Sequence, residues 1–271
     1  MSDISDSFAA TIERFSGFAD DYDRHRPQPP QALAALLTQI AQCPRPALVV
    51  DLGSGTGLSS RYWSDKAERV IGIEPSADMR RTALERGSLG NLQFHDGLSH
   101  CTGLPAGVAQ IVTCMQSLHW MEPQGTFEEA RRLLRPGGVF AAVDYDWPPV
   151  TGSWKADIAW EECQQRAASL EATLALDSRL RRWDKAQHLL RMRKSACFRF
   201  AREVLMHHID RGNAERHVGL LRSQGGIMDL LKAGHSSAEL GIDALELVAQ
   251  AELGPVARLW FWSARVRLGV V

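Results

Sequence analysis

The hydrophobic pattern of the chain changes its period several times along the sequence. Short apolar runs rich in Val, Ile and Leu alternate with segments in which apolar residues recur every three or four positions. The first pattern is typical of buried strands and the second of helices packed on a sheet. Strands are predicted over residues 48–52, 69–73, 92–94, 110–114, 139–144, 197–209 and 256–270. Helices are predicted over residues 7–22, 31–42, 59–66, 77–86, 214–221, 227–233 and 237–253.

Strands that alternate with helices indicate an α/β fold with a doubly wound, mostly parallel sheet. Residues 147–197 break this alternation, because they are rich in Trp, Arg, Glu and Leu and have no glycine after Gly152. We expect at least two amphipathic helices here, inserted between the fifth and sixth strands, where insertions commonly supply substrate specificity. We interpret the basic residues of this segment as one solvated helix face. The alternative is a patch that binds an anionic partner. The basic residues are Arg179, Arg181, Arg182, Lys185, Arg191, Arg193 and Lys194.

Composition and charge argue against several classes of protein. A net charge of -1 argues against a general binder of nucleic acid or of anionic membranes, which needs a basic excess. No apolar run approaches the roughly 20 residues of a membrane-spanning helix, and the N-terminus lacks a secretion signal. The 5 cysteines are scattered without a metal-ligand pattern. We therefore expect a cytoplasmic protein with reduced thiols, no membrane association and no metal site.

The most informative segment is the first predicted strand and the glycines that follow it. The strand contains Asp51 near its end and is followed by Gly53–Gly57 in a GxGxG pattern, with Glu74 about 20 residues further on. This arrangement predicts a βαβ nucleoside-binding unit whose second acid can bind a ribose. A dinucleotide site requires glycine at the position of Leu58, and Asp51 would repel a pyrophosphate but attract an ammonium or sulfonium group. The charge pattern favours S-adenosylmethionine over NAD.

These residues, together with later motifs, are similar to those of the class I S-adenosylmethionine-dependent methyltransferases. Within that class the chain resembles the methyltransferase type 11 or trans-aconitate methyltransferase-like group. The resemblance implies a seven-stranded Rossmann-like sheet with an antiparallel last strand. It also implies methyl transfer from S-adenosylmethionine to a small-molecule carboxylate, hydroxyl or amine, with S-adenosylhomocysteine as the product. The later motifs are Gly103–Pro105, Gln110–Cys114, Ser117–Trp120 and Leu133–Gly138.

The resemblance assigns roles to individual residues. Asp51 is expected to meet the ammonium of the cofactor directly or through water, and Glu74 to take both ribose hydroxyls. The acid-bearing loop that holds adenine aligns with Ser99 and His100, or alternatively with Asp96. A substrate pocket is expected from Tyr22, Arg26, Trp120 and Arg222. The full set of predicted cofactor contacts is Asp51, Gly53, Ser54, Gly55, Gly57, Glu74, Pro75, Ser76, Met79, Ser99, His100 and Gln116.

His119 and Trp120 follow the fourth predicted strand, where a doubly wound sheet places its chemistry. His119 is the candidate catalytic residue because the pKa of histidine suits a general base near neutral pH. The alternative is that the pair only lines the pocket. This loop lacks the Asn/Asp-Pro-Pro-aromatic tetrad of enzymes that methylate base amines, and Asp146–Pro149, which looks similar, follows the fifth strand instead. Methylation of DNA is therefore disfavoured.

We expect one methyltransferase domain over residues 1–271 that works as a monomer or homodimer without nucleic-acid or membrane partners. Two other functions remain: an S-adenosylmethionine-binding partner or regulator without activity, and a nicotinamide-dependent oxidoreductase. Within the domain we expect a lid helix over 1–30, a cofactor-binding core over 31–146, a helical substrate insertion over 147–197 and closing elements over 198–271.

Overall fold

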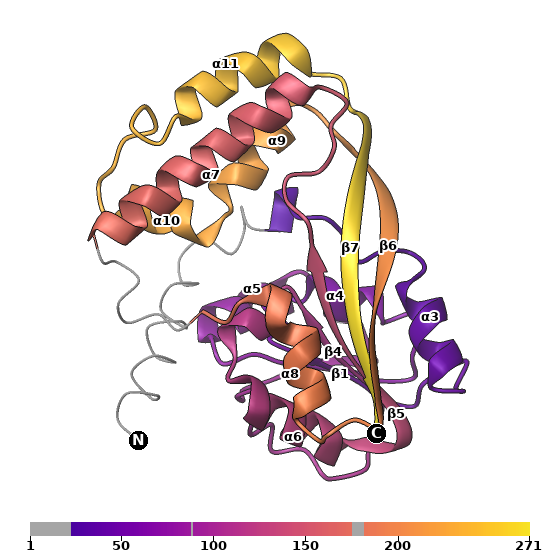
Figure 1. The fold of residues 1–271 in the computed structure, drawn as a ribbon. Helices are drawn as coiled ribbons and strands as arrows, with labels where there is room; N and C mark the ends of the chain where they lie inside the picture. The colour runs from indigo at the N-terminus through magenta and orange to yellow at the C-terminus, as the bar shows by residue number, and fades with distance from the viewer. Residues whose placement is uncertain (1–22, 88, 175–181) are drawn as a thin grey trace. The chain divides into compact units, whose positions relative to one another are not determined.

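A computed structural model describes residues 23–87, 89–174 and 182–271. These residues form a 7-stranded sheet in the order β3-β2-β1-β4-β5-β7-β6 (Figure 1). Strands β1 to β5 pair in parallel, as the alternation of strands and helices predicted, whereas β7 pairs with β5 in the antiparallel direction, as the family resemblance implied. The strands are β1 Val49–Leu52, β2 Val70–Ile73, β3 Leu92–His95, β4 Ala109–Met115, β5 Leu134–Tyr145, β6 Phe200–Gly212 and β7 Arg258–Val270.

The order of the strands reverses beside β1. Val49 of β1 pairs with Val70 of β2 on one side and with Ile111 of β4 on the other. In an open α/β sheet, ligands bind at the carboxyl ends of the strands at such a switch point. All four residues of β1 and of β2 are buried, which is typical of central strands in a parallel sheet.

Helices alternate with the strands, and polar side chains cap several of them. Ser76 accepts a hydrogen bond from Met79 N at the start of α5, and Glu122 accepts two from the first turn of α6, which begins with Pro123. The helices are α3 Leu33–Ile40, α4 Leu58–Tyr62, α5 Ala77–Glu85, α6 Pro123–Leu133, α7 Trp154–Leu174, α8 His188–Lys194, α9 Ala214–Arg222, α10 Gly225–Lys232 and α11 Ile242–Glu252, with 3-10 turns η1 Leu118–Trp120 and η2 Lys185–Gln187.

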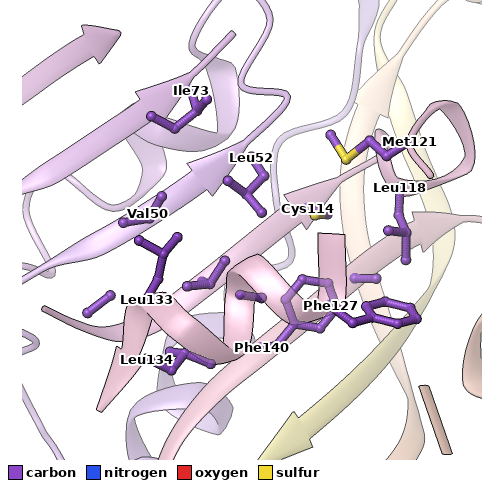
Figure 2. Close-up of a cluster of buried hydrophobic side chains, with 14 of the residues drawn as sticks. Val50, Leu52, Ile73, Cys114, Leu118, Met121, Phe127, Leu133, Leu134 and Phe140 are labelled. Atoms are coloured by element: carbon purple, nitrogen blue, oxygen red, sulfur yellow. The ribbon is translucent and has the colours of Figure 1, made fainter. Parts of the chain in front are cut away.

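A hydrophobic core lies between the central strands and α6. Figure 2 shows side chains from β1, β2, β4 and β5 that meet those of α6. The rings of Phe127 on α6 and Phe140 on β5 pack edge to face with centroids 5.7 Å apart, and Phe198 stacks on Phe140 at 5.5 Å. This packing fixes β4 and β5, whose carboxyl ends carry the candidate acceptor chemistry.

The chain divides into two compact units, which are described separately. One comprises residues 28–145, 182–206 and 264–271, and the described part of the other comprises 23–27, 146–174 and 207–263. In the second unit α7 packs against α9, α10 and α11, and Trp147 stacks on Trp160 with centroids 6.2 Å apart. The predicted insertion 147–197 contributes α7 to one unit and α8 to the other. The predicted domain boundaries stay a prediction.

The predicted strands are all present, and differences are confined to element ends. The helix predicted over 237–253 begins only at Ile242, because Gly241 adopts a left-handed conformation with φ 77°. The helix predicted over 59–66 ends at Tyr62. The helix predicted over 7–22 lies outside the described residues. None of the helices in the described ranges is both long enough and apolar enough to cross a membrane.

Candidate functional site

The loop between β1 and α4 is built from three glycines with positive φ, at 66° for Gly53, 55° for Gly55 and 84° for Gly57. A Cβ at Gly53 would lie 2.5 Å from Met121 Cε, and one at Gly57 would lie 2.5 Å from a guanidinium nitrogen of Arg61. A Cβ at Gly55 would instead meet nothing within 4 Å. The loop therefore packs tightly at both ends and presents bare backbone at its middle glycine, where a ligand can approach closely.

Asp51 lies within β1 beneath this loop and is fully buried. Its Oδ2 accepts hydrogen bonds from the hydroxyls of Ser59 at 2.5 Å and Ser60 at 2.7 Å, and its Oδ1 accepts one from Thr113 at 3.0 Å. Burial raises the pKa of this carboxyl, while the three hydroxyl donors oppose the rise. Because neutral hydroxyls surround the carboxylate, it acts on a ligand through its electrostatic field more readily than by direct contact.

Glu74 follows β2 and turns back onto the glycine loop. Its Oε2 accepts from the backbone N–H of Gly55 at 2.9 Å, and its Oε1 accepts from that of Ser76 at 2.9 Å. Burial raises its pKa, and the two backbone N–H donors oppose this. The sequence-predicted residues Pro75, Ser76 and Met79 continue from Glu74 into the first turn of α5, with Met79 buried. The acid predicted to bind a ribose therefore reaches the glycine loop.

Ser54, in the glycine loop, carries a buried polar atom. Its side chain is 5% exposed, and within the described part of the chain its Oγ has no hydrogen-bond partner. Buried hydroxyls are normally paired, so such an atom marks a place where a ligand or water completes the structure. The open side of Gly55, the Ser54 hydroxyl and the Glu74 carboxylate together fit a nucleoside with a charged substituent.

The two alternatives for the adenine loop both follow β3. Ser99 is buried and its hydroxyl lies 2.8 Å from that of Thr126 on α6, whereas His100 is exposed. Asp96 forms an ion pair of 2.8 Å with Arg80. The structure thus places Ser99 in a packing role at the start of this loop and leaves both alignments open.

The carboxyl end of β5 carries a buried charge network that centres on Asp144. Asp144 Oδ1 lies 3.0 Å from Lys185 Nζ, and its Oδ2 accepts from Arg267 Nη1 at 2.8 Å. Arg267 Nε also lies 2.8 Å from Glu203 Oε2. Lys185 Nζ further donates to Gln116 Oε1 at 2.8 Å. The network joins β4, β5, β6, β7 and η2 at one edge of the sheet.

Two of these residues correct the sequence interpretation. Lys185 was assigned to a solvated helix face, but its ammonium turns inward onto Asp144 and its side chain is 26% exposed. Arg267 lies in the strand predicted over residues 256–270, where its charge alone would favour an exposed position, but its side chain is 3% exposed. Buried cations require partners, and these partners are distant in the sequence. Asp144 itself was missed as a site residue, although an acid that ends a buried strand was a usable signal.

His119 lies next to this network in η1. It is 5% exposed, its Nδ1 is 3.9 Å from Asp144 Oδ1, and its carbonyl accepts from Trp183 N at 2.8 Å. The ring packs beside Trp120 with centroids 4.9 Å apart. The distance to Asp144 is too long for a hydrogen bond, so the contact with this carboxylate is electrostatic. A general-base role for His119 stays a prediction.

Of the remaining predicted pocket residues, one lies outside the described residues and two belong to the second unit. Tyr22 is outside the described residues. Arg26 belongs to the second unit, where it donates to the carbonyl of Ser223 at 2.6 Å and lies over the ring of Trp147 at 4.9 Å. Arg222, in the same unit, pairs with Glu246 at 3.0 Å. A cation that already has a carboxylate partner within its own unit is a weaker acceptor ligand than the sequence suggested.

Comparison with known proteins gives consistent matches. Residues 50–142 match the family model described as "Methyltransferase domain". The chain is 30% identical over 153 residues to malonyl-[acyl-carrier protein] O-methyltransferase of Pseudescherichia vulneris, which covers 54% of this chain and 59% of that protein. It is 33% identical over 123 residues to erythromycin 3''-O-methyltransferase of Saccharopolyspora erythraea, covering 42% of this chain and 40% of that protein.

The fold has a counterpart of almost equal length among solved structures. A protein of Anaeromyxobacter dehalogenans assigned as a type II methyltransferase superposes with a TM-score of 0.62 and 22% identity, over 90% of this chain and 97% of that one. At this identity the likeness supports the fold. The alignments with the two O-methyltransferases span less than two thirds of their lengths.

Proposed function

Because the chain belongs to the class I S-adenosylmethionine-dependent methyltransferases, we propose that it transfers a methyl group from S-adenosylmethionine to a small-molecule acceptor. The observation that carries this proposal is the glycine loop, in which Gly55 presents open backbone directly beside the Glu74 carboxylate. Asp51 adds a second buried acid under the same loop. Two acids held by neutral donors suit a cofactor that carries ammonium and sulfonium charges, and they oppose a pyrophosphate.

The residues present fit this cofactor. Glu74 would hold the ribose hydroxyls, the Ser54 hydroxyl and the Gly55 backbone would contact the methionine part, and the Asp51 carboxylate would favour its positive charges. The cofactor, when bound, supplies a methyl group that is already activated on a positively charged sulfur. The chain therefore has to align an acceptor, exclude water and remove a proton where the acceptor requires it.

The acceptor side of the site begins where β4 and β5 end. His119 lies there and would accept a proton from a hydroxyl or amine acceptor, while Trp120 would form a wall of the pocket. A carboxylate acceptor would need no base, because it is already ionised at neutral pH. The two relatives whose names state an O-methyltransferase support oxygen acceptors as the first to test.

We also propose a cytoplasmic location and small-molecule partners. The net charge of -1 supports the absence of nucleic-acid and membrane partners. The free cysteines of the described residues, Cys43, Cys101, Cys114, Cys163 and Cys197, support a reducing compartment.

Calorimetric titration with S-adenosylmethionine and, separately, with NAD tests the proposal. The wild type should bind S-adenosylmethionine and prefer it to NAD, and Glu74→Ala should weaken that binding at least tenfold. Glu74→Gln keeps the shape of the side chain and separates loss of charge from collapse of the loop. Glu68→Ala is the matched control, because Glu68 precedes the same strand and is exposed.

The outcomes separate the alternatives. Preference for NAD, or no binding of S-adenosylmethionine, would overturn the cofactor assignment. Binding without formation of S-adenosylhomocysteine across carboxylate, hydroxyl and amine acceptors would instead favour a binding protein without activity.

A further inference from the structure

The network around Asp144 joins carboxylates and cations from several elements of the fold. Its ion pairs link two carboxylates, Asp144 and Glu203, to three cations, Lys185, Arg265 and Arg267. All five residues belong to the same compact unit. Asp144 and Arg267 are both buried, so their charges interact where the interior screens charge poorly.

Two of the cations, Arg267 and Lys185, differ in how far their side chains are exposed. Arg267 is buried and is shared between Asp144 and Glu203, so its charge is committed to the interior. Lys185 shares the same Asp144 carboxylate, but its side chain is 26% exposed. Because Asp144 already has Arg267 as a counter-ion, the Lys185 ammonium can serve a further anion without leaving a buried acid uncompensated.

A second observation at the same place points to a ligand. The Gln116 side chain accepts from Lys185 through Oε1. Its Nε2 is buried, and among the described residues it has no hydrogen-bond partner. Gln116 also has a positive φ of 54°, which is uncommon for a residue with a side chain. An unpaired buried donor is costly, so Nε2 needs an acceptor that the described chain does not supply.

The two donors are Lys185 Nζ and Gln116 Nε2. They lie close together because Lys185 Nζ is bonded to Gln116 Oε1, and Oε1 and Nε2 belong to the same carboxamide. A group that accepted from Gln116 Nε2 and Lys185 Nζ at once would have two acceptor atoms and a negative charge. A carboxylate has this form. The position is where β4 and β5 end, because Gln116 follows β4 and Asp144 lies in β5. β4 is the neighbour of β1 and β5 the next strand, so at about 4.8 Å per strand the subsite lies roughly 5–10 Å from the glycine loop, toward the acceptor side.

We propose that Lys185 and Gln116 form a subsite that binds a carboxylate of the methyl acceptor. The inference rests on the proposed function, since it assigns the acceptor to this edge of the sheet. It makes these two residues determinants of specificity: acceptors that carry an anion are selected over neutral molecules of the same shape.

Binding to the protein saturated with S-adenosylhomocysteine tests the subsite without knowledge of the natural acceptor. The probes are benzoate and hexanoate, each compared with its neutral amide, benzamide and hexanamide. The wild type should bind each carboxylate at least tenfold more tightly than the amide. Lys185→Gln should abolish this preference, and Lys185→Arg should retain it within about threefold because the charge is kept.

Two further variants keep the test specific. Gln116→Met preserves the volume of the side chain and leaves Lys185 in place, so it should weaken carboxylate binding several-fold with the thermal midpoint unchanged. Lys194→Gln is the matched control, because Lys194 is an exposed lysine of the same unit at the end of α8. It should leave both carboxylate and amide binding unchanged.

The proposal fails if the wild type shows no preference for carboxylates or if Lys185→Gln keeps the preference. It also fails if Lys185→Gln weakens binding of S-adenosylmethionine tenfold, because the subsite would then serve the carboxylate of the cofactor itself. Should Lys185→Gln not fold, Gln116→Met and Lys185→Arg decide the question. Loss of S-adenosylmethionine binding in the wild type would refute the proposed function, whereas intact cofactor binding without carboxylate selection would refute this inference alone.

Discussion

Three buried acids lie along the carboxyl edge of one sheet, and the two halves of that edge neutralise them differently. On the proposed cofactor side, Asp51 accepts from three hydroxyls and Glu74 from two backbone N–H groups. On the acceptor side, Asp144 lies between two cations, Lys185 and Arg267. Neutral donors stabilise a charge without cancelling it, whereas cations cancel it.

Because their partners differ, buried carboxylates produce electrostatic potentials of opposite sign in the two halves. The cofactor half keeps its negative charge and favours a ligand with positive groups. In the acceptor half two cations face Asp144, which under our proposal favours a ligand with a negative group. An acid at a strand end therefore does not by itself specify a ligand, because the donors packed around it decide the sign of the local potential.

The largest expected effect comes from making the same substitution in both halves. Asp144→Asn should destabilise the protein by about 3 kcal/mol, because it leaves buried Arg267 short of a counter-charge. Asp51→Asn should cost no more than about 1 kcal/mol, because the loss of hydrogen bonds is offset by removal of a charge that burial already disfavours. Urea denaturation at pH 7 measures both.

The decisive result is which of the two variants loses more free energy of unfolding. Equal losses of stability, or a larger loss for Asp51→Asn, would mean that the two acids have equivalent environments. Calorimetry with S-adenosylmethionine adds an independent readout: Asp51→Asn should weaken binding strongly, whereas Asp144→Asn should change it by less than threefold.

The cofactor half was predictable from the sequence because its determinants are local. The β-branched run of β1, the glycines after it and Glu74 all fall within one βαβ unit, and strand pairing in register brings them together. The charge logic at Asp51 followed from its place in that unit. What the sequence did not show was that Ser59, Ser60 and Thr113 enclose the carboxylate.

The acceptor half was not predictable in the same way. Arg267 is 123 residues from Asp144 in the sequence, and nothing near it in the sequence indicates a buried partner. Lys185 lies in a basic run that is typical of a solvated helix. Only the packing of η2 against the ends of β4 and β5 turns its ammonium inward. Burial of a charged residue depends on a distant partner, which periodicity does not encode.

His188 provides the next test, on the acceptor side. It is fully buried, and burial lowers its pKa to about 4, with nearby Arg267, Arg191 and Lys185 acting in the same direction and Asp144 against it. Below the ordinary histidine pKa near 6.5 the unfolded chain binds a proton that the folded chain does not. Stability should therefore fall by about 2 kcal/mol between pH 7 and pH 5 and continue to fall toward pH 4.

Replacing this side chain should remove that part of the pH dependence. His188→Gln should flatten the loss of stability between pH 7 and pH 5, whatever its effect at pH 7. Denaturation curves at both pH values measure this for the variant and the wild type. An unchanged slope in the variant would show that another group takes up the proton and that the pKa of His188 is not lowered in the folded protein.

The smallest expected effect is the pH dependence of cofactor binding, and it tests the cofactor half. Burial raises the pKa of both Asp51 and Glu74, so these carboxyls take up protons at a higher pH than ordinary acids and their negative field weakens as the pH falls. The affinity for S-adenosylmethionine should drop about threefold between pH 7.5 and pH 5.5, a change of less than roughly 1 kcal/mol. S-adenosylhomocysteine has a neutral sulfur and should lose less affinity over the same range. Equal losses for the two ligands would indicate that the acids act on the shared ammonium or ribose alone, and a gain of affinity in acid would contradict the negative field that distinguishes this half from the other.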